Sequence, residues 1–406
     1  MESRISGIFG QHDAKTLAQL EDVAGRAEKA ALMADGHVGY VMPIGGVAAY
    51  DNRASVVGVG FDIACGNCAI ATDIHLDDFS RRDLGAIANE IQQTISFGIG
   101  RTNDARDSPA DHPLFESAEW SALPRDANGA ALMKKARAQL GTVGSGNHYV
   151  DVFADETGMV WVGVHFGSRG LGHTIASGFL ALSQGKEWGK RVPENEVLLD
   201  LSTPLGDAYW ALMTLAGEYA YAGREWVAGK VVRMLGGRQL DIVHNHHNFA
   251  WREKHYGADY IVVRKGATPA FPGQRGFVGG SMGDDSVILE GARGAGELGS
   301  PLQQAALFST VHGAGRVMSR TEAAGKRSWK TKAIKSPGKI SWEMLREWID
   351  ARGVVLRGGG LDESPHAYRR LPDVLAAQGE TIRVLHTLRP LIVVMAGENE
   401  FDPYKD

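Results

Sequence analysis

The segment "GFDIACGNC" (residues 60–68) holds both cysteines of this 406-residue chain, at positions 65 and 68. A Cys-x-x-Cys spacing is typical of a thioredoxin-like redox pair or of half a zinc site, because both need two thiolates close together. The sequence has no second cysteine pair to complete a four-cysteine site, and no strand–CxxC–helix pattern is evident. The alternative is that Asp62 and one cysteine act with residues from elsewhere in the chain.

Several histidines stand at predicted strand ends, most of them beside a glycine turn. They are His148 in "GTVGSGNHYVDV", His165 in "VGVHFGSRGLGH", His244, His246 and His247 in "VHNHHNFAW", and His312 in "STVHGAGRVMSR". Histidine, carboxylate and thiolate are the common ligands of transition metals, and strand ends with glycine turns are where such side chains converge. A single histidine is more often a core or surface residue, but this recurrence predicts a metal site.

Two common nucleotide-binding signatures are missing. There is no G-x-x-x-x-G-K-[ST] loop, and "MADGHVG" has Met33 where a nucleotidyl-lysine motif would carry its lysine. A nucleotide would need another anchor. Residues 264–286 offer cationic side chains, glycines and the hydroxyls of Ser281 and Ser286. Taken alone, that segment would be interpreted as a surface loop.

The elements that must position these residues mix helical and strand patterns. The predicted helices are residues 13–34, 77–97, 130–140, 174–190, 206–236, 341–351 and 366–388. Strands are predicted within 38–71 and at "HYVDVFA", "MVWVGVHF", "YIVVRKG", "SVILEG" and "LIVVM". Glycine-rich motifs occur throughout with no break in composition. We therefore expect an α+β protein with one domain over residues 1–406, in which residues 398–406 are a C-terminal extension.

The composition excludes several classes of protein. With 44% hydrophobic and 22% charged residues, the chain is typical of a globular protein, and no apolar run is long enough to cross a membrane. Two cysteines exclude a disulfide scaffold and favour a cytoplasmic location, as does the lack of an apolar signal core at the N-terminus. The net charge of −5 gives no general attraction to nucleic acid, so a polyanion must meet a local basic patch.

Together, these segments resemble the RtcB family of RNA-splicing ligases. The matching strings follow the family's order from about residue 30 to 395: "DGHVGYVMPIGGVAA", "GVGFDIACG", "GTVGSGNH", "VHFGSRGLGH", "HHN", "RKGA", "GSMG" and "HGAGRVMSR". "GFDIACG" and "HGAGRVMSR" are highly specific. The resemblance implies an RNA ligase built on one large domain, with central β-sheets flanked by helices.

In that family, these motifs hold two Mn²⁺ ions with a bridging cysteine. The resemblance implies that the ligands here are Asp62, Cys65, His148, His165 and His247. Cys68 falls where the family needs no cysteine, so the Cys-x-x-Cys spacing is accidental. A bridging thiolate must lose its proton, which two adjacent dications ensure. Affinity order alone would favour Zn²⁺, so manganese comes only from the resemblance.

The resemblance also implies a GTP site. His312 corresponds to the histidine that becomes guanylylated, and an imidazole forms a phosphoramidate without a lysine. Arg169 and Arg320 would face the phosphates of the RNA ends, since a planar guanidinium suits an oxyanion. The implied nucleotide contacts are Asn147, Ser281, Ser286, Ala314 and Tyr368.

The implied reaction has four steps. GTP guanylylates His312, and an RNA 2′,3′-cyclic phosphate is opened to a 3′-phosphate. GMP then moves to this 3′-phosphate, and a 5′-hydroxyl attacks to displace GMP and form the phosphodiester. The partner is therefore RNA with a 3′-phosphate or 2′,3′-cyclic phosphate end and a 5′-hydroxyl end. The protein archease assists some family members.

Three departures from the family pattern concern the end of the site that binds the base. Asp151 stands where the family usually has a glutamate that reads guanine. Met395 or Ala396 replaces a C-terminal lysine that contacts the base, and the chain continues as "ENEFDPYKD". Arg369 replaces the lysine of "AYK". The metal and nucleophile positions match, so we expect nucleotidyl transfer to survive and base preference to remain the open question.

RNA binding needs a basic patch, and residues 316–339 are the candidate segment. It follows His312, contains Glu322 as its one acidic residue, and carries Trp329 as a stacking surface. Its basic residues are Arg316, Arg320, Lys326, Arg327, Lys330, Lys332, Lys335 and Lys339. A solvated basic loop is the other interpretation.

Three other functions stay open from the sequence. A divergent paralogue would seal particular RNA breaks, DNA or capped ends. A dinuclear metallophosphoesterase would only hydrolyse cyclic phosphates, and GTP would then not label the protein. A non-catalytic nucleotide or RNA binder is the third, although the intact His312 and the full set of metal ligands argue against it.

Overall fold

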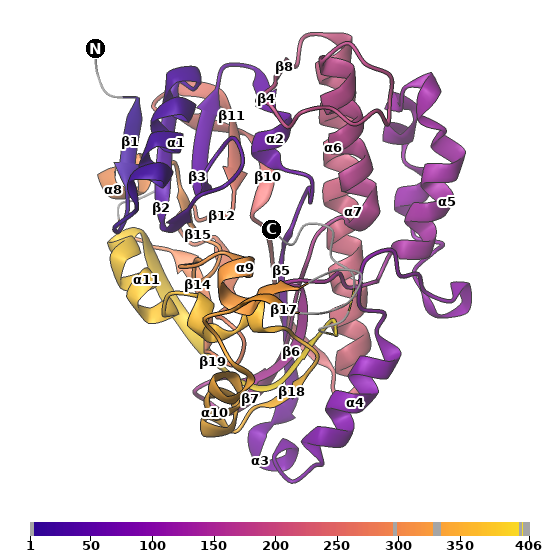
Figure 1. Cartoon of the computed structure of the whole chain (residues 1–406), viewed down its shortest axis with the longest axis vertical. Helices are drawn as coiled ribbons and strands as arrows, with labels where there is room; N and C mark the ends of the chain where they lie inside the picture. The colour runs from indigo at the N-terminus through magenta and orange to yellow at the C-terminus, as the bar shows by residue number, and fades with distance from the viewer. Residues whose placement is uncertain (1–3, 295–298, 328–333, 398–399, 401–406) are drawn as a thin grey trace.

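The computed structural model describes residues 4–294, 299–327, 334–397 and 400. Two large β-sheets form the centre of the molecule, and helices cover them from several sides (Figure 1). The predicted α+β fold class is therefore confirmed.

The first sheet has five strands in the order β1-β2-β3-β11-β10. These are β1 (Ile5–Ile8), β2 (Lys29–His37), β3 (Ile44–Tyr50), β11 (Ala258–Lys265) and β10 (Asn248–His255). Helix α1 (Ala14–Arg26) packs on this sheet through Leu20 and Val23. Its first turn is capped by Asp13, whose carboxylate accepts hydrogen bonds from the Lys15 and Thr16 amides.

The single helix predicted for residues 13–34 is wrong in its second half. Helix α1 ends at Arg26, and the following "KAALMADGH" is strand β2. Alanine, leucine and methionine favour helices, but residues 30–36 are buried without alternation. A strand covered on both faces shows such continuous burial, and tertiary packing overrides local propensity there.

The second, larger sheet has the order β13-β14-β19-β6-β7-β5-β9, with β18 paired to β19. Its strands are β13 (Arg275–Val278), β14 (Ser286–Gly291), β19 (Ile382–Met395), β6 (Tyr149–Ala154), β7 (Met159–Phe166), β5 (Gly66–His75), β9 (Gln239–His246) and β18 (Val355–Arg357). Its two end strands are linked by side chains, because the Phe277 amide donates to Asn245 and Arg275 pairs with Asp241. The sheet therefore curls until it is nearly closed.

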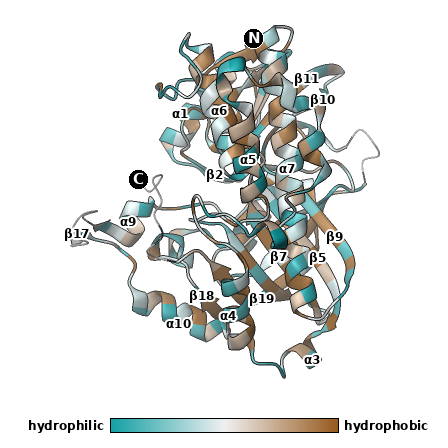
Figure 2. Cartoon of the chain, turned by 90° about the vertical axis from the view of Figure 1, so that its right-hand side faces the viewer, coloured by the Kyte–Doolittle hydropathy of each residue, from teal (hydrophilic) through white to brown (hydrophobic). Residues whose placement is uncertain are grey.

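The helix predicted for residues 366–388 is also only partly present. Helix α11 (Leu371–Gln378) stops at Gly379, which has a φ of 71°, and β19 then runs from Ile382 to Met395. The apolar segment "LIVVM" was predicted to be a short strand, but the paired strand β19 begins nine residues earlier, at Ile382. Figure 2 shows the hydrophobic character of this strand. Pairing with β14 along its exposed first half extends the strand beyond what hydrophobicity predicts.

The remaining elements connect and cover the sheets. The helices predicted near 130–140, 206–236 and 341–351 are confirmed. The helix predicted for 174–190 begins and ends earlier, at Arg169 and Ser183, and residues 77–97 form two helices instead of one. The helices are α2 (Val56–Val59), α3 (Leu76–Phe79), α4 (Leu84–Thr94), α5 (Gly129–Gln139), α6 (Arg169–Ser183), α7 (Pro204–Met234), α8 (Pro301–Ala305), α9 (Arg320–Ala324) and α10 (Trp342–Arg352). Short two-stranded sheets are β12 (Ala267–Pro269) with β15 (Ser309–Val311), β16 (Gly325–Arg327) with β17 (Ile334–Pro337), and β4 (Arg53–Ser55) with β8 (Leu198–Asp200).

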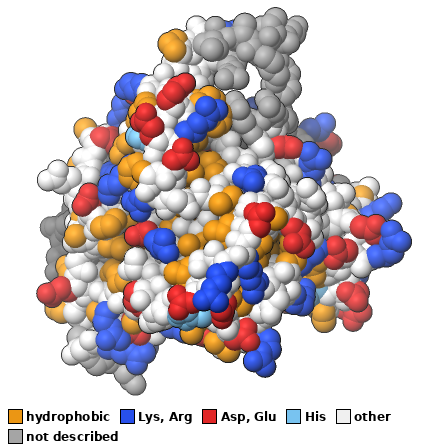
Figure 3. All heavy atoms as spheres, turned by 90° about the horizontal axis from the view of Figure 1, so that it is seen from below, with side chains coloured by type: hydrophobic (Ala, Val, Ile, Leu, Met, Phe, Trp, Pro, Cys, Tyr) orange, Lys and Arg blue, Asp and Glu red, His pale blue; other side chains and the backbone are white. Residues whose placement is uncertain are grey.

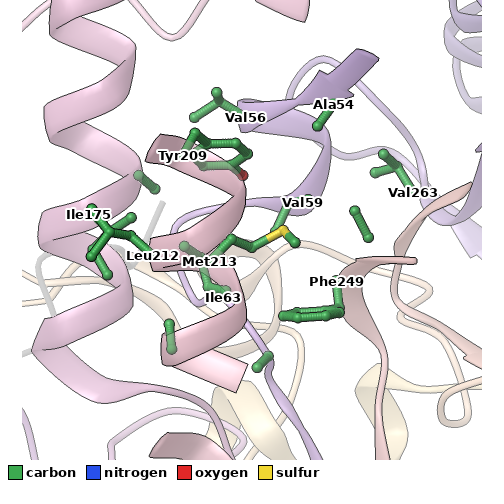
Figure 4. Packing of buried hydrophobic residues seen from close by; sticks show 14 of the residues in the cluster. Ala54, Val56, Val59, Ile63, Ile175, Tyr209, Leu212, Met213, Phe249 and Val263 are labelled. Carbon is green, nitrogen blue, oxygen red and sulfur yellow. The ribbon is translucent and has the colours of Figure 1, made fainter. Parts of the chain in front are cut away.

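The long helix α7 anchors the largest hydrophobic cluster. Figure 4 shows Leu212 and Met213 of α7 between Ile175 of α6 and Phe249 of β10. Leu212 and Met213 are fully buried. Burying a side chain of this size contributes roughly 1.5–3 kcal/mol, so the cluster holds α7 firmly behind the strand ends.

No helix among the described residues is long and apolar enough to cross a membrane. Figure 3 shows basic and acidic side chains interspersed on one face. Such a mixture agrees with the small net charge of −5.

Candidate active site

The candidate ligands lie at the ends of four adjacent strands, in the sheet order β6-β7-β5-β9, and in the turn before β5 that carries Asp62. Strand β5 pairs antiparallel with both β7 and β9, so Gly66 lies opposite Phe166 and His246. Cys65 and His247 lie just beyond this point and His165 one residue before it, so the register brings the three together. The His247 amide donates to the Cys65 carbonyl at 2.8 Å, which joins two of the segments directly.

The five predicted ligands form two overlapping groups. Cys65, His165 and His247 are one group, and Asp62, Cys65 and His148 are the other; within each group the potential ligand atoms all lie within 4.8 Å of one another. The Cys65 Sγ is 3.6 Å from His165 Nε2 and 3.7 Å from His148 Nε2. Only the cysteine belongs to both groups, which is the arrangement that a thiolate shared by two cations requires.

The donor set fits divalent metal ions. It combines one carboxylate, one thiol and three imidazoles, and the buried Nδ1 of His247 has no hydrogen-bond partner among the described residues. The Asp62 carboxylate lies directly against the backbone of Gly167, where a Cβ would be only 2.2 Å from Oδ1. Only glycine therefore fits at position 167 beside this carboxylate. Cys68 lies elsewhere, fully buried in an apolar cluster with Ile70.

Burial controls the charges of these groups. It lowers the pKa of His165 and His247 well below the usual value, so both imidazoles are neutral, as metal binding requires. Burial, and then the neighbouring Asp62, raises the pKa of the Cys65 thiol well above its usual range. Burial alone would raise the pKa of Asp62, but the hydrogen bond and charge of His148, together with Arg169 and Cys65, outweigh it and the pKa is lowered.

Asn67, which follows Cys65 by two residues, fixes the orientation of His165. Its Nδ2 donates to the Phe277 carbonyl at 2.9 Å, so its Oδ1 must be the atom that faces His165 Nδ1 at 2.7 Å. Nδ1 is thereby the protonated nitrogen, and Nε2 presents its lone pair toward Cys65. The sequence did not indicate this role, although Asn67 lies inside the cysteine segment of residues 60–68.

His312 follows strand β15 and lies beside the ligand groups, with its ring centroid 4.9 Å from that of His247. Its Nδ1 is 2.6 Å from Asp35 Oδ2, which also accepts the backbone amides of His312 and Gly313. Asp35 is fully buried. Burial alone would raise its pKa, but the adjacent His312 outweighs that effect and lowers it.

This contact leaves His312 Nε2 as the reactive atom. The carboxylate of Asp35 takes the proton-bearing Nδ1, and Nε2 has no hydrogen-bond partner within the described residues. An imidazole held this way is a nucleophile aimed by its neighbour. The sequence did not predict a role for Asp35, because its segment "MADGHVG" stands out only by the absence of a lysine.

The groups line one cavity of about 340 Å³. Its walls include the five candidate ligands and His312, as well as Asn147, Asp151, Ser281, Ala314, Tyr368 and Arg320. Two predicted residues lie outside this lining. Ser286 accepts a hydrogen bond from the Gly280 amide, and Arg169 lies behind His148, with its Nη1 3.5 Å from Nδ1 of that ring.

A charged cluster forms another part of the wall. Arg316 Nη1 donates to the Tyr368 hydroxyl at 2.6 Å, and that hydroxyl donates to Glu363. Arg320 is 3.1 Å from Asp362 Oδ2. Both arginines therefore already have carboxylate neighbours, and a bound phosphate would have to compete with these carboxylates.

The predicted basic segment is only partly described. Lys326, Lys335 and Lys339 are exposed on or beside strands β16 and β17. Trp329, Lys330 and Lys332 lie outside the described residues, as does the side chain of Arg327. The use of this segment for RNA stays a prediction.

Asp151 and Tyr149 lie on β6 in the same cavity. Asp151 Oδ1 and the Tyr149 hydroxyl are buried without hydrogen-bond partners among the described residues. Burial raises the pKa of Asp151 well above its usual value. Met395, in the segment where the family lysine is missing, lines this part of the cavity too.

This chain is similar in sequence to known RNA ligases over most of its length. The family model described as "tRNA-splicing ligase RtcB" matches residues 14–396. The RNA-splicing ligase RtcB of Escherichia coli K12 is 30% identical over 388 residues, covering 90% of this chain and 89% of that protein. The tRNA-splicing ligase RtcB of Archaeoglobus fulgidus is 31% identical, with 89% and 86% covered, and that of Thermococcus kodakarensis is 30% identical, with 93% and 90% covered. The chain therefore belongs to the tRNA-splicing ligase RtcB family and is an enzyme of the ligase class.

Proposed function

We propose that this chain joins an RNA 3′-phosphate or 2′,3′-cyclic phosphate end to a 5′-hydroxyl end, using GTP and Mn²⁺. Family membership supports RNA joining in general. The observation that carries the detailed proposal is the position of His312, which is held by Asp35 and stands beside His247 in a cavity lined by all five candidate ligands.

The metal ions would be held by the two groups that share Cys65. His165 and His247 would complete one group, and Asp62 and His148 the other. When bound, two divalent cations would supply Lewis-acid stabilisation of the charge that develops on a transferring phosphoryl group. The ordering of His165 by Asn67 prepares its Nε2 lone pair for this task.

His312 would begin the reaction by attacking the α-phosphorus of GTP through Nε2. The N–P bond forms as the bond from the α-phosphorus to the bridging oxygen breaks, and pyrophosphate leaves. The imidazole becomes positively charged in this step, and the Asp35 carboxylate on Nδ1 stabilises that charge. Water opens a 2′,3′-cyclic phosphate end to a 3′-phosphate. An oxygen of this 3′-phosphate then attacks the guanylyl phosphorus as its bond to His312 Nε2 breaks, and the 5′-hydroxyl finally attacks the 3′-phosphorus, so that the phosphodiester forms as GMP leaves.

Other residues would bind the substrates. Tyr368 and Asp151 would contact the base, with Asn147, Ser281 and Ala314 along the nucleotide. Arg320 would meet an RNA phosphate by exchanging its carboxylate neighbours for the ligand. Ser286 and Arg169 would act indirectly, Ser286 through the Gly280 turn and Arg169 through His148.

The test is covalent labelling with α-labelled GTP in the presence of Mn²⁺. Wild type should retain an acid-labile label, while His312→Ala and Cys65→Ala should retain none. Cys68→Ala is the matched control, because Cys68 is also a buried cysteine but belongs to neither candidate group, and it should label like wild type. Label from ATP alone would show a changed base preference. Absence of label from every nucleotide would refute guanylyl transfer and favour the phosphoesterase.

A further inference from the structure

The fully buried guanidinium of Arg224, in the middle of helix α7, lies directly behind the candidate metal site. Its Nη1 donates to the carbonyls of Ala64 at 2.8 Å and Phe166 at 2.6 Å. Its Nη2 lies 2.8 Å from His246 Nδ1, and its Nε donates to His244 Nε2 at 2.9 Å. These bonds occupy four of the five N–H groups that an arginine offers.

Three of these partners are chain neighbours of one ligand group. Ala64 precedes Cys65, Phe166 follows His165, and His246 precedes His247. We infer that Arg224 is a positioning residue, whose guanidinium sets the spacing of Cys65, His165 and His247 and thereby the metal affinity and geometry of that group. The inference rests on the proposed function, because it assumes that this group binds a metal ion.

Cys65, His165 and His247 come from the ends of three different strands, so a side chain that bonds to all three segments can fix their spacing. Ala64 has a φ of +60°, a left-handed conformation that is unfavourable for a residue with a Cβ, and the bond to its carbonyl helps to hold it there. Metal–ligand distances tolerate only about 0.2 Å of error. A planar guanidinium with fixed donor directions can hold several acceptors at once, which the single ammonium of a lysine cannot do.

A purely structural role explains Arg224 less well. Burying a cation is costly, and an apolar side chain of similar volume usually fills a core at least as well. Among the described residues, no carboxylate bonds to Arg224. Arg264 provides the contrast, because it is equally buried but pairs with the Glu253 carboxylate at 2.7 Å. The Arg224 bonds go instead to the segments that carry the ligands.

The experiment compares Arg224→Lys with Arg264→Lys. The second variant is the matched control, because it also replaces a fully buried guanidinium but one that does not bond to the ligand segments. Mn²⁺ binding is measured by equilibrium dialysis, and Co²⁺ binding by the thiolate-to-cobalt absorption, which reports the geometry at Cys65. Thermal unfolding of the metal-free proteins measures stability separately. We expect Arg224→Lys to bind both ions ten- to a hundredfold more weakly and to change the cobalt spectrum. Arg264→Lys should lose stability but bind metal like wild type.

The outcomes separate this inference from the proposed function. If wild type binds neither ion, the metal site itself is refuted. If wild type binds but Arg224→Lys matches it, or Arg264→Lys is weakened equally, only the role of Arg224 is refuted. Should Arg224→Lys fail to fold, His246→Leu removes a single bond to the guanidinium and should weaken binding severalfold with the same spectral change; unchanged binding would overturn the inference.

Discussion

Replacing Asp35 with asparagine tests how His312 is activated. The carboxylate Oδ2 accepts three N–H groups, two from His312 and one from Gly313, while its buried Oδ1 has no partner among the described residues. An asparagine can keep its oxygen toward His312 only by placing its NH₂ group at the position of Oδ1. The variant is nearly isosteric, so it removes the charge and leaves the shape.

The expected magnitude follows from that single charge. Hydrogen bonds to a charged group contribute roughly 1.5–3 kcal/mol, against about 1 kcal/mol for neutral ones, and here the bond strengthens as His312 becomes cationic. A loss of about 2–3 kcal/mol in the transition state corresponds to guanylylation that is about a hundredfold slower. The unpaired NH₂ group should separately lower the free energy of unfolding by about 1–3 kcal/mol.

The assay is a single-turnover time course of labelling by α-labelled GTP at saturating Mn²⁺, with bound metal measured in the same samples. Asp35→Asn should bind as much metal as wild type and label about a hundredfold more slowly, while His312→Ala should not label at all. A labelling rate within threefold of wild type would refute the role assigned to Asp35. So would a slow rate that is fully explained by lost metal.

Two further predictions concern groups around the cavity. Asn67→Leu removes the acceptor that fixes the His165 tautomer, so Mn²⁺ affinity measured by dialysis should fall ten- to a hundredfold, and unchanged affinity would contradict that role. Burial lowers the pKa of Lys265 to about 8 from 10.5, so the folded state binds fewer protons than the unfolded state between these values and stability rises with pH. The free energy of unfolding of wild type should therefore increase relative to Lys265→Met across that window, and a constant difference in chemical denaturation would contradict it.

The structure brings the five candidate ligands together, and each of them lies in a short motif that the family resemblance matches. Asp62 and Cys65 share one segment, and His148, His165 and His247 each lie next to a strand end that glycine or pairing makes recognisable. Antiparallel pairing then brings these ends together without further information. Local patterns alone predicted a metal site among several histidines, and the family resemblance was needed to choose these five ligands from them.

The residues that orient the site could not be predicted in the same way. The contact between Asp35 and His312 spans 277 positions, and nothing near Asp35 indicates its partner. Arg224 lies in a helix where the sequence offers no sign that a cation is buried, because its acceptors are mostly backbone carbonyls and histidines of other segments. Likewise, β2 contains helix-favouring residues, and only its burial between layers makes it a strand.

The protonation of Asp151 should decide which base the site prefers. An ionised carboxylate accepts two hydrogen bonds and suits guanine, whose Watson–Crick edge presents N–H donors at N1 and N2. A protonated carboxyl offers one donor and one acceptor, which suits the N1 acceptor and N6 donor of adenine. Because burial raises the pKa of Asp151 well above its usual value, the neutral form persists to higher pH than in an exposed aspartate, and ionisation follows as the pH rises further.

The ratio of labelling by GTP to labelling by ATP should therefore rise with pH in the wild type, as Asp151 loses its proton. Asp151→Asn is the control, because an amide offers one donor and one acceptor at every pH, so its ratio should be lower and constant. Dividing the two labelling rates cancels the pH dependence of His312 and of the metal ligands, which both nucleotides share. A wild-type ratio that does not change with pH, or one that Asp151→Asn reproduces, would show that Asp151 does not read the base and that its unpartnered oxygen serves another purpose.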